Sequence, residues 1–277
     1  MRLRTSRRFT NRMQGEHMHG KGGQSTEFAD FRDYTEGDDI RYVDWNIFAR
    51  LGRPYLKLYK HEEEQAVAVL IDASASMGFE GKLRQAQRLA GAFAVMSLFG
   101  AERLALYGFN ERGARIVSLP QMRGRGSLRR AFGFIESLEA GGSMVLEEGV
   151  EAMLRHHRGR GVAILISDFL SPNDLAPSFN RLFSAGLEVC AVQVLGPTEL
   201  DPELTEDARL LDSESRHTLD VTVASDVLTL YQGYLERFRR HLEALCRQRG
   251  GKFMCLSSAE PIEAVVTERL RRRGWAG

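Results

Sequence analysis

A carboxylate and two hydroxyls follow directly after an apolar run, at Asp72, Ser74 and Ser76. The run covers residues 66–71, and its valine and isoleucine content is typical of a strand that is buried on both faces of a parallel sheet. Ligands of α/β sheets bind beyond the carboxyl ends of such strands. These three side chains therefore stand where a hard cation could be held.

Two later segments could complete a cation site. Gly141-Gly142-Ser143 precedes an expected helix, and Ser167-Asp168 ends an expected strand. Magnesium prefers oxygen ligands and keeps several waters, so hydroxyls and carboxylates from separate loops suffice. With only two carboxylates the metal would stay under-neutralised, and an acidic side chain of a protein partner could fill an open position. The predicted ligands of Mg²⁺, or of Mn²⁺ or Ca²⁺, are Asp72, Ser74, Ser76, Ser143 and Asp168.

Other chemistries also fit the first loop. Aspartate and serine often cap helices, so Asp72, Ser74 and Ser76 could satisfy the free amides of the next helix, and Ser143 could cap its own. Asp72 could also be the nucleophile of a phosphohydrolase. Such enzymes usually place a second aspartate two residues on, where this chain has Ser74. We therefore expect a non-enzymatic metal site, with a phosphohydrolase as the alternative and a structural subunit with an empty site as a third possibility.

The elements that must position these residues alternate between strands and helices. Strands are expected near 66–71, 103–109, 162–167, 188–194 and 252–256. Amphipathic segments separate them, which is typical of a doubly wound sheet. The longest helix has apolar residues at spacings of three and four between Leu228 and Leu245, and we expect it to cover the sheet rather than to form a coiled coil. The predicted fold class is α/β, with a doubly wound, mostly parallel sheet in three layers.

Residues 1–62 differ from the rest of the chain because they are rich in glycine and turn-forming residues and show no sustained helical period. We expect them to form an N-terminal extension packed on a main domain of residues 63–277. The crude alternation over 55–59 predicts an edge strand that leads toward the sheet. A charged group in the extension could be a recognition surface, but an internal network of salt bridges that pins the extension to the sheet is favoured. Its members are Arg32, Asp38, Asp39, Arg41, Asp44 and Trp45.

Composition excludes several classes of function. The formal net charge is +1, so no overall field attracts nucleic acid, and the longest apolar stretches fall far short of the roughly 20 residues that span a bilayer. The arginine-rich start lacks the apolar stretch of an export signal, so we expect a cytoplasmic protein. Residues 15–21 nearly match a P-loop, but Gly22 stands where a serine or threonine should bind magnesium. His17 and His19 have no nearby cysteine or carboxylate pattern and are expected in a solvated loop.

The predicted ligand set resembles a known cation site. Asp72-x-Ser74-x-Ser76, with a hydroxyl at Ser143 and a carboxylate at Asp168, resembles the metal-ion-dependent adhesion site of von Willebrand factor A-type domains. Those domains are doubly wound α/β modules that bind protein ligands through a divalent cation. The third element of that family is usually threonine, and Ser143 keeps the hydroxyl without the methyl group. The resemblance implies a metal-dependent protein-binding module.

The N-terminal half resembles the bacterial family filed as domain of unknown function 58. The resemblance is carried by Gly15-x-His17, Gly22-Gly23, Glu27-Phe28, Arg32-x-Tyr34-x-x-Gly37-Asp38-Asp39-x-Arg41-x-x-Asp44-Trp45, Ala49-Arg50 and Glu62. Members are often found beside MoxR-type AAA+ ATPases and are thought to act as adaptors or chaperone-like partners. The resemblance therefore implies a MoxR-type partner, in the assembly or maturation of other proteins. Many members carry membrane spans ahead of this region, and we expect none here. Residues 211–215 loosely resemble a short hairpin that the family carries before its long helix.

Overall fold

The structure is a computed structural model with two compact units. One unit is Arg8–Glu64, and the other is Gln65–Gly277 together with Met1–Arg7. The expected packing of the N-terminal extension on the main domain stays a prediction. The residues that the structure describes are 3, 10–11, 27–62, 65–109, 116–142, 146–170, 173–202, 208–211, 218–221 and 224–275.

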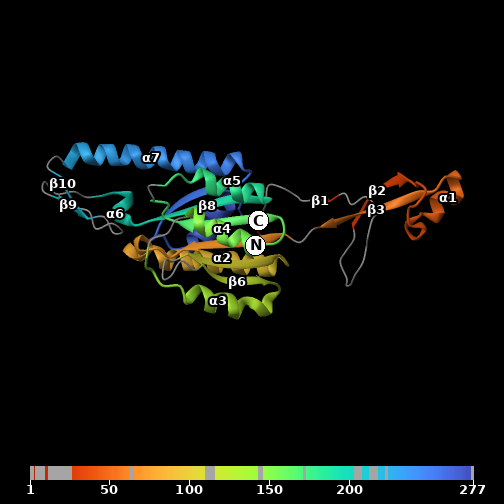
Figure 1. Cartoon of the computed structure of the whole chain (residues 1–277), viewed down its shortest axis with the longest axis horizontal. Helices are drawn as coiled ribbons and strands as arrows, with labels where there is room; N and C mark the ends of the chain where they lie inside the picture. The colour runs from red at the N-terminus through yellow and green to blue at the C-terminus, as the bar shows by residue number, and fades with distance from the viewer. Residues whose placement is uncertain are drawn as a thin grey trace. The chain divides into compact units, whose positions relative to one another are not determined.

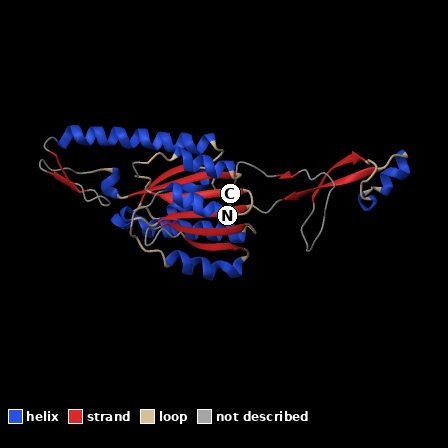
Figure 2. Cartoon of the chain, in the orientation of Figure 1, coloured by secondary structure: helices blue, strands red, loops and turns tan. Residues whose placement is uncertain are grey.

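A six-stranded sheet forms the centre of the larger unit (Figures 1 and 2). Its strands lie in the order β11-β8-β7-β4-β5-β6, and all neighbours are parallel except β5 and β6. The predicted α/β fold with a doubly wound, mostly parallel sheet is confirmed. The bounds are β4 (Ala66–Asp72), β5 (Arg103–Phe109), β6 (Val117–Met122), β7 (Gly161–Ser167), β8 (Leu187–Leu195) and β11 (Phe253–Ser257).

Helices cover both faces of this sheet. The side chains of each strand point alternately to the two faces and so contribute to two separate cores. On β4, Val67 and Ile71 face one core, whereas Ala68 and Leu70 face the other. The first core is covered by α2 (Lys82–Phe99), α3 (Leu128–Glu136), α8 (Ile262–Ala264), η4 (Val265–Arg269) and α9 (Leu270–Arg272). The second is covered by α4 (Leu146–His156), α5 (Ala176–Ser184) and α7 (Ala224–Gln248). A fully buried aliphatic side chain contributes about 1.5–3 kcal/mol, so β4, buried along its whole length, is a firm base for the loop that follows it.

The longest helix, α7, packs on the sheet as predicted. Leu242, Leu245 and Cys246 lie in the second core beside residues of β7 and β8. The helix ends just before Gly250, whose φ of 69° is the left-handed conformation that glycine adopts at helix ends. Among the helices of the described ranges, none combines the length and the apolar composition that crossing a bilayer requires.

Between β8 and α7 lie a short helix and a two-stranded ribbon. Helix α6 (Pro197–Leu200) directly follows β8. The ribbon pairs β9 (Ala208–Leu211) with β10 (Thr218–Val221) in antiparallel register (Figure 1). A hairpin is thus present before the long helix, where the loose family resemblance placed one.

The smaller unit is built on its own antiparallel sheet. Its strands β1 (Thr10–Asn11), β2 (Glu27–Asp33) and β3 (Tyr55–Glu62) lie in the order β1-β3-β2, with η1 (Ile40–Tyr42) and α1 (Trp45–Leu51) between β2 and β3. The prediction of an edge strand at 55–59 is wrong: β3 is the central strand, because β1 and β2 pair with its two sides.

Candidate functional site

The first predicted loop starts from the centre of the sheet. β4 lies between β5 and β7, and Asp72 pairs in register with Phe109, the last residue of β5. The backbone N–H of Ala73 donates to the Phe109 carbonyl at 2.8 Å, which continues the pairing past the end of the strand. Asp72 therefore leaves the sheet at its carboxyl edge, the position expected of a ligand-binding residue.

Asp72 is buried, with 4% of its surface exposed, and its carboxylate accepts two hydrogen bonds. Oδ1 accepts from the Ser74 backbone N–H at 2.8 Å, and Oδ2 accepts from the Ser167 hydroxyl at 2.5 Å. Burial, and next the nearby charge of Asp168, raises the pKa of Asp72 to about 6, although both hydrogen bonds oppose the rise. The site therefore holds a carboxylate whose negative charge lacks a sufficient positive partner.

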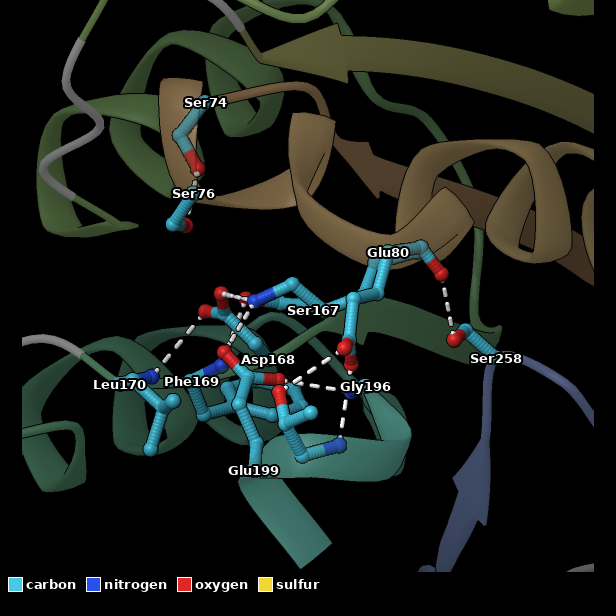
Figure 3. A network of polar contacts seen from close by, with 12 residues as sticks. Ser74, Ser76, Glu80, Ser167, Asp168, Phe169, Leu170, Gly196, Glu199 and Ser258 are labelled. Atoms are coloured by element: carbon cyan, nitrogen blue, oxygen red, sulfur yellow. Dashed lines mark hydrogen bonds and ion pairs between the residues drawn. The ribbon is translucent and has the colours of Figure 1, made fainter. Parts of the chain in front are cut away.

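The two serine hydroxyls of the first loop face one another. Ser74 Oγ and Ser76 Oγ lie 3.1 Å apart, as Figure 3 shows. Ser74 precedes the 3₁₀ helix η2 (Ala75–Gly81), yet its side chain makes no capping hydrogen bond there, and α2 is preceded by Gly81. The capping alternative therefore does not account for the Ser74 hydroxyl, although the Asp72 carboxylate does accept one amide of the loop.

The second predicted loop lies against the first. The Gly141 N–H donates to the Ala73 carbonyl at 2.9 Å, and the Ala75 N–H donates to the Gly142 carbonyl at 2.8 Å. Gly142 adopts a φ of 70°, which favours glycine, so its presence suits this turn. Ser143 itself lies outside the described residues, and its role as a ligand stays a prediction.

Asp168 is buried at the end of β7, and an unpredicted lysine contacts it. Lys82 Nζ lies 2.8 Å from Asp168 Oδ2 and 2.7 Å from Glu199 Oε1. Asp168 Oδ1 accepts from the Leu170 N–H at 3.1 Å. Burial favours the neutral amine, but the ion pairs with Asp168 and Glu199 outweigh it, and the pKa of Lys82 is raised. The fifth predicted ligand thus belongs to a buried ion-pair cluster.

The same edge carries a second set of contacts that reaches α6 (Figure 3). Glu199 Oε2 accepts from the Gly196 N–H at 2.7 Å. Glu80 accepts from the Thr198 N–H at 3.1 Å and from its hydroxyl at 2.9 Å, and its own carbonyl accepts from Ser258 Oγ at 2.6 Å. Glu80 has a φ of 44°, a conformation that costs a non-glycine residue about 1–3 kcal/mol unless its surroundings hold it. These contacts hold it there.

The donor set fits a hard cation. Lys82 pairs with Asp168 and Glu199, whereas the Asp72 carboxylate accepts hydrogen bonds from the Ser74 N–H and the Ser167 hydroxyl. Over the described part of the chain, no three His, Cys, Asp or Glu side chains converge as a metal-binding group. A cation here would rest on the Asp72 carboxylate and serine hydroxyls, with waters completing its shell, as Mg²⁺ allows.

The charged residues predicted as a network in the N-terminal extension pair within their own unit. Arg32 contacts Asp38 at 2.6 Å, and Lys57 contacts Asp44 at 3.0 Å. Asp44 also caps α1 by accepting from two backbone N–H groups. Arg41 pairs with Asp39, whereas the Trp45 ring is exposed. Residues 15–22, which hold the His-x-His pair and the near P-loop, lie outside the described residues.

Comparison with known proteins places the chain in a family. Residues 30–243 match the model described as "Protein of unknown function DUF58". The chain belongs to the DUF58 family. Uncharacterized proteins of Mycobacterium tuberculosis and Mycobacterium bovis are each 30% identical to this DUF58 member over 223 residues, which is 78% of this chain and 69% of the relative. The predicted membership of this family is thereby confirmed.

Two solved structures are similar to this DUF58 member. One is the conserved hypothetical protein BatB from Bacteroides thetaiotaomicron, at a TM-score of 0.46 and 13% identity, over 76% of this chain and 98% of that chain. The other is a von Willebrand factor type A protein from Catenulispora acidiphila, at a TM-score of 0.45 and 14% identity, over 78% of this chain and 43% of that chain.

Sequence reasoning missed two residues of the candidate site, Lys82 and Glu199. Lys82 is the first residue of α2, where the helix dipole disfavours a cation, so a lysine at this position indicates nearby carboxylates. Glu199 follows the end of β8 by four residues, and that strand ends at the same edge as β4 and β7. Both signals are present in the sequence, but neither indicates which residues Lys82 and Glu199 contact.

Proposed function

We propose that this DUF58 member is a non-enzymatic adaptor that binds a divalent cation at Asp72, Ser74 and Ser76 and engages an acidic side chain of a protein partner through it. The pair of serine hydroxyls carries the proposal: their oxygens lie 3.1 Å apart beside a buried carboxylate, and the Ser74 hydroxyl caps no helix. Mg²⁺ is the expected cation, with Mn²⁺ and Ca²⁺ as alternatives. When bound, the cation would supply positive charge and open coordination positions for a partner's carboxylate.

The proposed partner is a MoxR-type AAA+ ATPase. Support comes from the family, whose members the sequence resemblance associates with such ATPases in the assembly or maturation of other proteins. We place this work in the cytoplasm. Binding of nucleic acid is not proposed, because the formal net charge of +1 gives no overall attraction to phosphates.

A phosphohydrolase that uses Asp72 is the rival function. Against it, Ser74 holds the position of the general acid, and both Asp72 oxygens already accept hydrogen bonds within the protein. A nucleophile needs an oxygen directed at its substrate. The adaptor role requires only that the hydroxyls and one carboxylate lone pair meet a cation.

Calorimetric titration with MgCl₂ and MnCl₂ tests the cation site. We expect saturable binding to the wild type, no binding to Asp72→Asn, and unchanged binding to the matched control Asp201→Asn, which removes an exposed carboxylate near α6. Asp72→Asn keeps the shape of the side chain and removes its charge. Absence of binding to the wild type would refute the cation site, and phosphatase turnover that Asp72→Asn abolishes would favour the rival enzyme.

A second experiment tests the partner. A purified MoxR-type ATPase from the same genome is immobilised, and binding of the chain is measured with MgCl₂ and then with EDTA. The proposal requires binding that EDTA removes and that Asp72→Asn lacks. Binding that is equal in EDTA would contradict a cation-mediated contact, and no binding in either condition would refute this choice of partner.

A further inference from the structure

Lys82 is fully buried (0% exposed) between two carboxylates. Burial of an ammonium costs several kcal/mol unless its partners compensate. Its place at the first residue of α2 adds an unfavourable interaction with the positive end of the helix dipole. The ammonium of Lys82 is therefore present at this edge although burial and the helix dipole both disfavour it. The proposed cation site does not by itself explain why it is there.

The two aspartates at this edge are occupied differently. Asp168 Oδ2 contacts the Lys82 ammonium, and its Oδ1 accepts a backbone N–H from Leu170. Within the described part of the chain, the hydrogen-bond donors to Asp72 are neutral, namely the Ser74 N–H and the Ser167 hydroxyl. A carboxylate that is ion-paired offers less charge to a metal than one bonded to neutral donors, because the ammonium already neutralises it. Asp72 is thus the aspartate whose negative charge remains available to a cation.

We propose that Lys82 is a positioning residue that keeps Asp168 and Glu199 off the cation, so that Asp72 is the one of these three carboxylates that coordinates it. The inference rests on the proposed function and deepens it. A cation held by one carboxylate and neutral oxygens keeps a net positive charge, which is the condition for attracting a partner's acidic side chain. Because Lys82 holds Asp168 and Glu199, the second carboxylate that binds the cation has to come from the partner.

The Lys82–Glu199 contact also provides an internal control. Glu199 Oε2 accepts a hydrogen bond from the Gly196 N–H, and the Glu199 carbonyl accepts one from the Tyr231 hydroxyl at 2.8 Å. These two hydrogen bonds of Glu199 stabilise the position of α6. Glu199→Gln removes one charge from Lys82 but leaves the Lys82–Asp168 pair intact. It should loosen α6 without releasing Asp168 to the cation.

The experiment measures Mn²⁺ and Mg²⁺ binding by calorimetry on the full chain and its variants. Lys82→Met should bind roughly tenfold tighter than wild type, because the released Asp168 adds a second carboxylate ligand. Lys82→Met combined with Asp168→Asn should bind within about threefold of wild type, since it removes a pair that takes no part in coordination while the Gly196 N–H still binds the Glu199 carboxylate. Glu199→Gln should also bind within about threefold, while amide hydrogen exchange at Gly196 and at residues 198–200 becomes faster.

The outcomes separate this inference from the proposed function. Binding to the wild type with unchanged or weaker binding to folded Lys82→Met would overturn the role of Lys82 alone. A loss of more than about tenfold in the double variant would show that Asp168 is a direct ligand. If Lys82→Met does not fold, by far-ultraviolet circular dichroism, the double variant decides, since its neutral pair leaves no unpaired buried charge at Asp168. Absence of binding to the wild type would overturn both proposals together.

Discussion

Gly196→Ala should destabilise the protein through Glu80 alone. A Cβ atom built on Gly196 would lie 2.1 Å from Glu80 Oε2 and 3.1 Å from Glu80 Cβ. Gly196 has a φ of −68°, which any residue adopts, so backbone strain makes no contribution. The Glu80 side chain must therefore move, and its two hydrogen bonds with Thr198 would be lost.

The size of the effect follows from those bonds. They join a carboxylate to neutral donors at a partly exposed position, so together they contribute about 1–2 kcal/mol. We expect Gly196→Ala to lower the free energy of unfolding by that amount in urea denaturation monitored by circular dichroism. Glu80→Ala should cost a similar amount because it loses the same two bonds.

The combined variant is the decisive control. With Glu80 already shortened to alanine, adding Gly196→Ala should change the free energy of unfolding by less than about 0.5 kcal/mol, because the carboxylate oxygen at 2.1 Å is gone and only the milder contact with the Cβ atom at 3.1 Å remains. Equal destabilisation by Gly196→Ala in both backgrounds would refute the reasoning, since the clash would then be with something other than the Glu80 side chain.

Three further outcomes are expected. The pKa of Asp72 is raised from 3.8 to about 6. Without a cation, its contribution to the free energy of unfolding is therefore present below about pH 4 and is lost as the pH rises through 6, a fall of about 3 kcal/mol. Asp72→Asn should remove this fall, measured by urea denaturation in EDTA at a series of pH values. Burial lowers the pKa of His157, so His157→Gln should reduce the loss of stability as pH falls below about 6.5, measured by the same titration. Gly251→Ala would place Cβ 1.7 Å from the Val189 carbonyl oxygen, a backbone atom of β8, and should cost about 3 kcal/mol in thermal unfolding.

Most of the sheet could be predicted from the sequence because burial on both faces leaves a plain signal. Every residue of β4, β7 and β8 is buried, and most of them are apolar. β6 was not predicted, because it is an antiparallel edge strand with mostly exposed residues and a proline within it. β3 was found as a strand, but its central place depends on pairing with segments far away in sequence, which local alternation does not encode.

The candidate site was predicted only as far as local signals reach. The Asp72–Ser76 loop was found because a polar cluster follows a buried strand. Lys82 was missed because its contact with Asp168 joins residues 86 positions apart, and its contact with Glu199 joins residues 117 positions apart. The ion-pair cluster therefore forms only when the fold brings the carboxyl ends of β4, β7 and β8 together at one edge of the sheet.

The most direct test of the account is a crystal of the full chain soaked in MnCl₂ and measured for anomalous scattering. We expect one strong peak beside the Asp72 carboxylate and the hydroxyls of Ser74 and Ser76, at metal–oxygen distances of about 2.0–2.4 Å, with Asp168 still paired to Lys82. Absence of a peak there, or a peak coordinated by Asp168 and Glu199 instead, would contradict it.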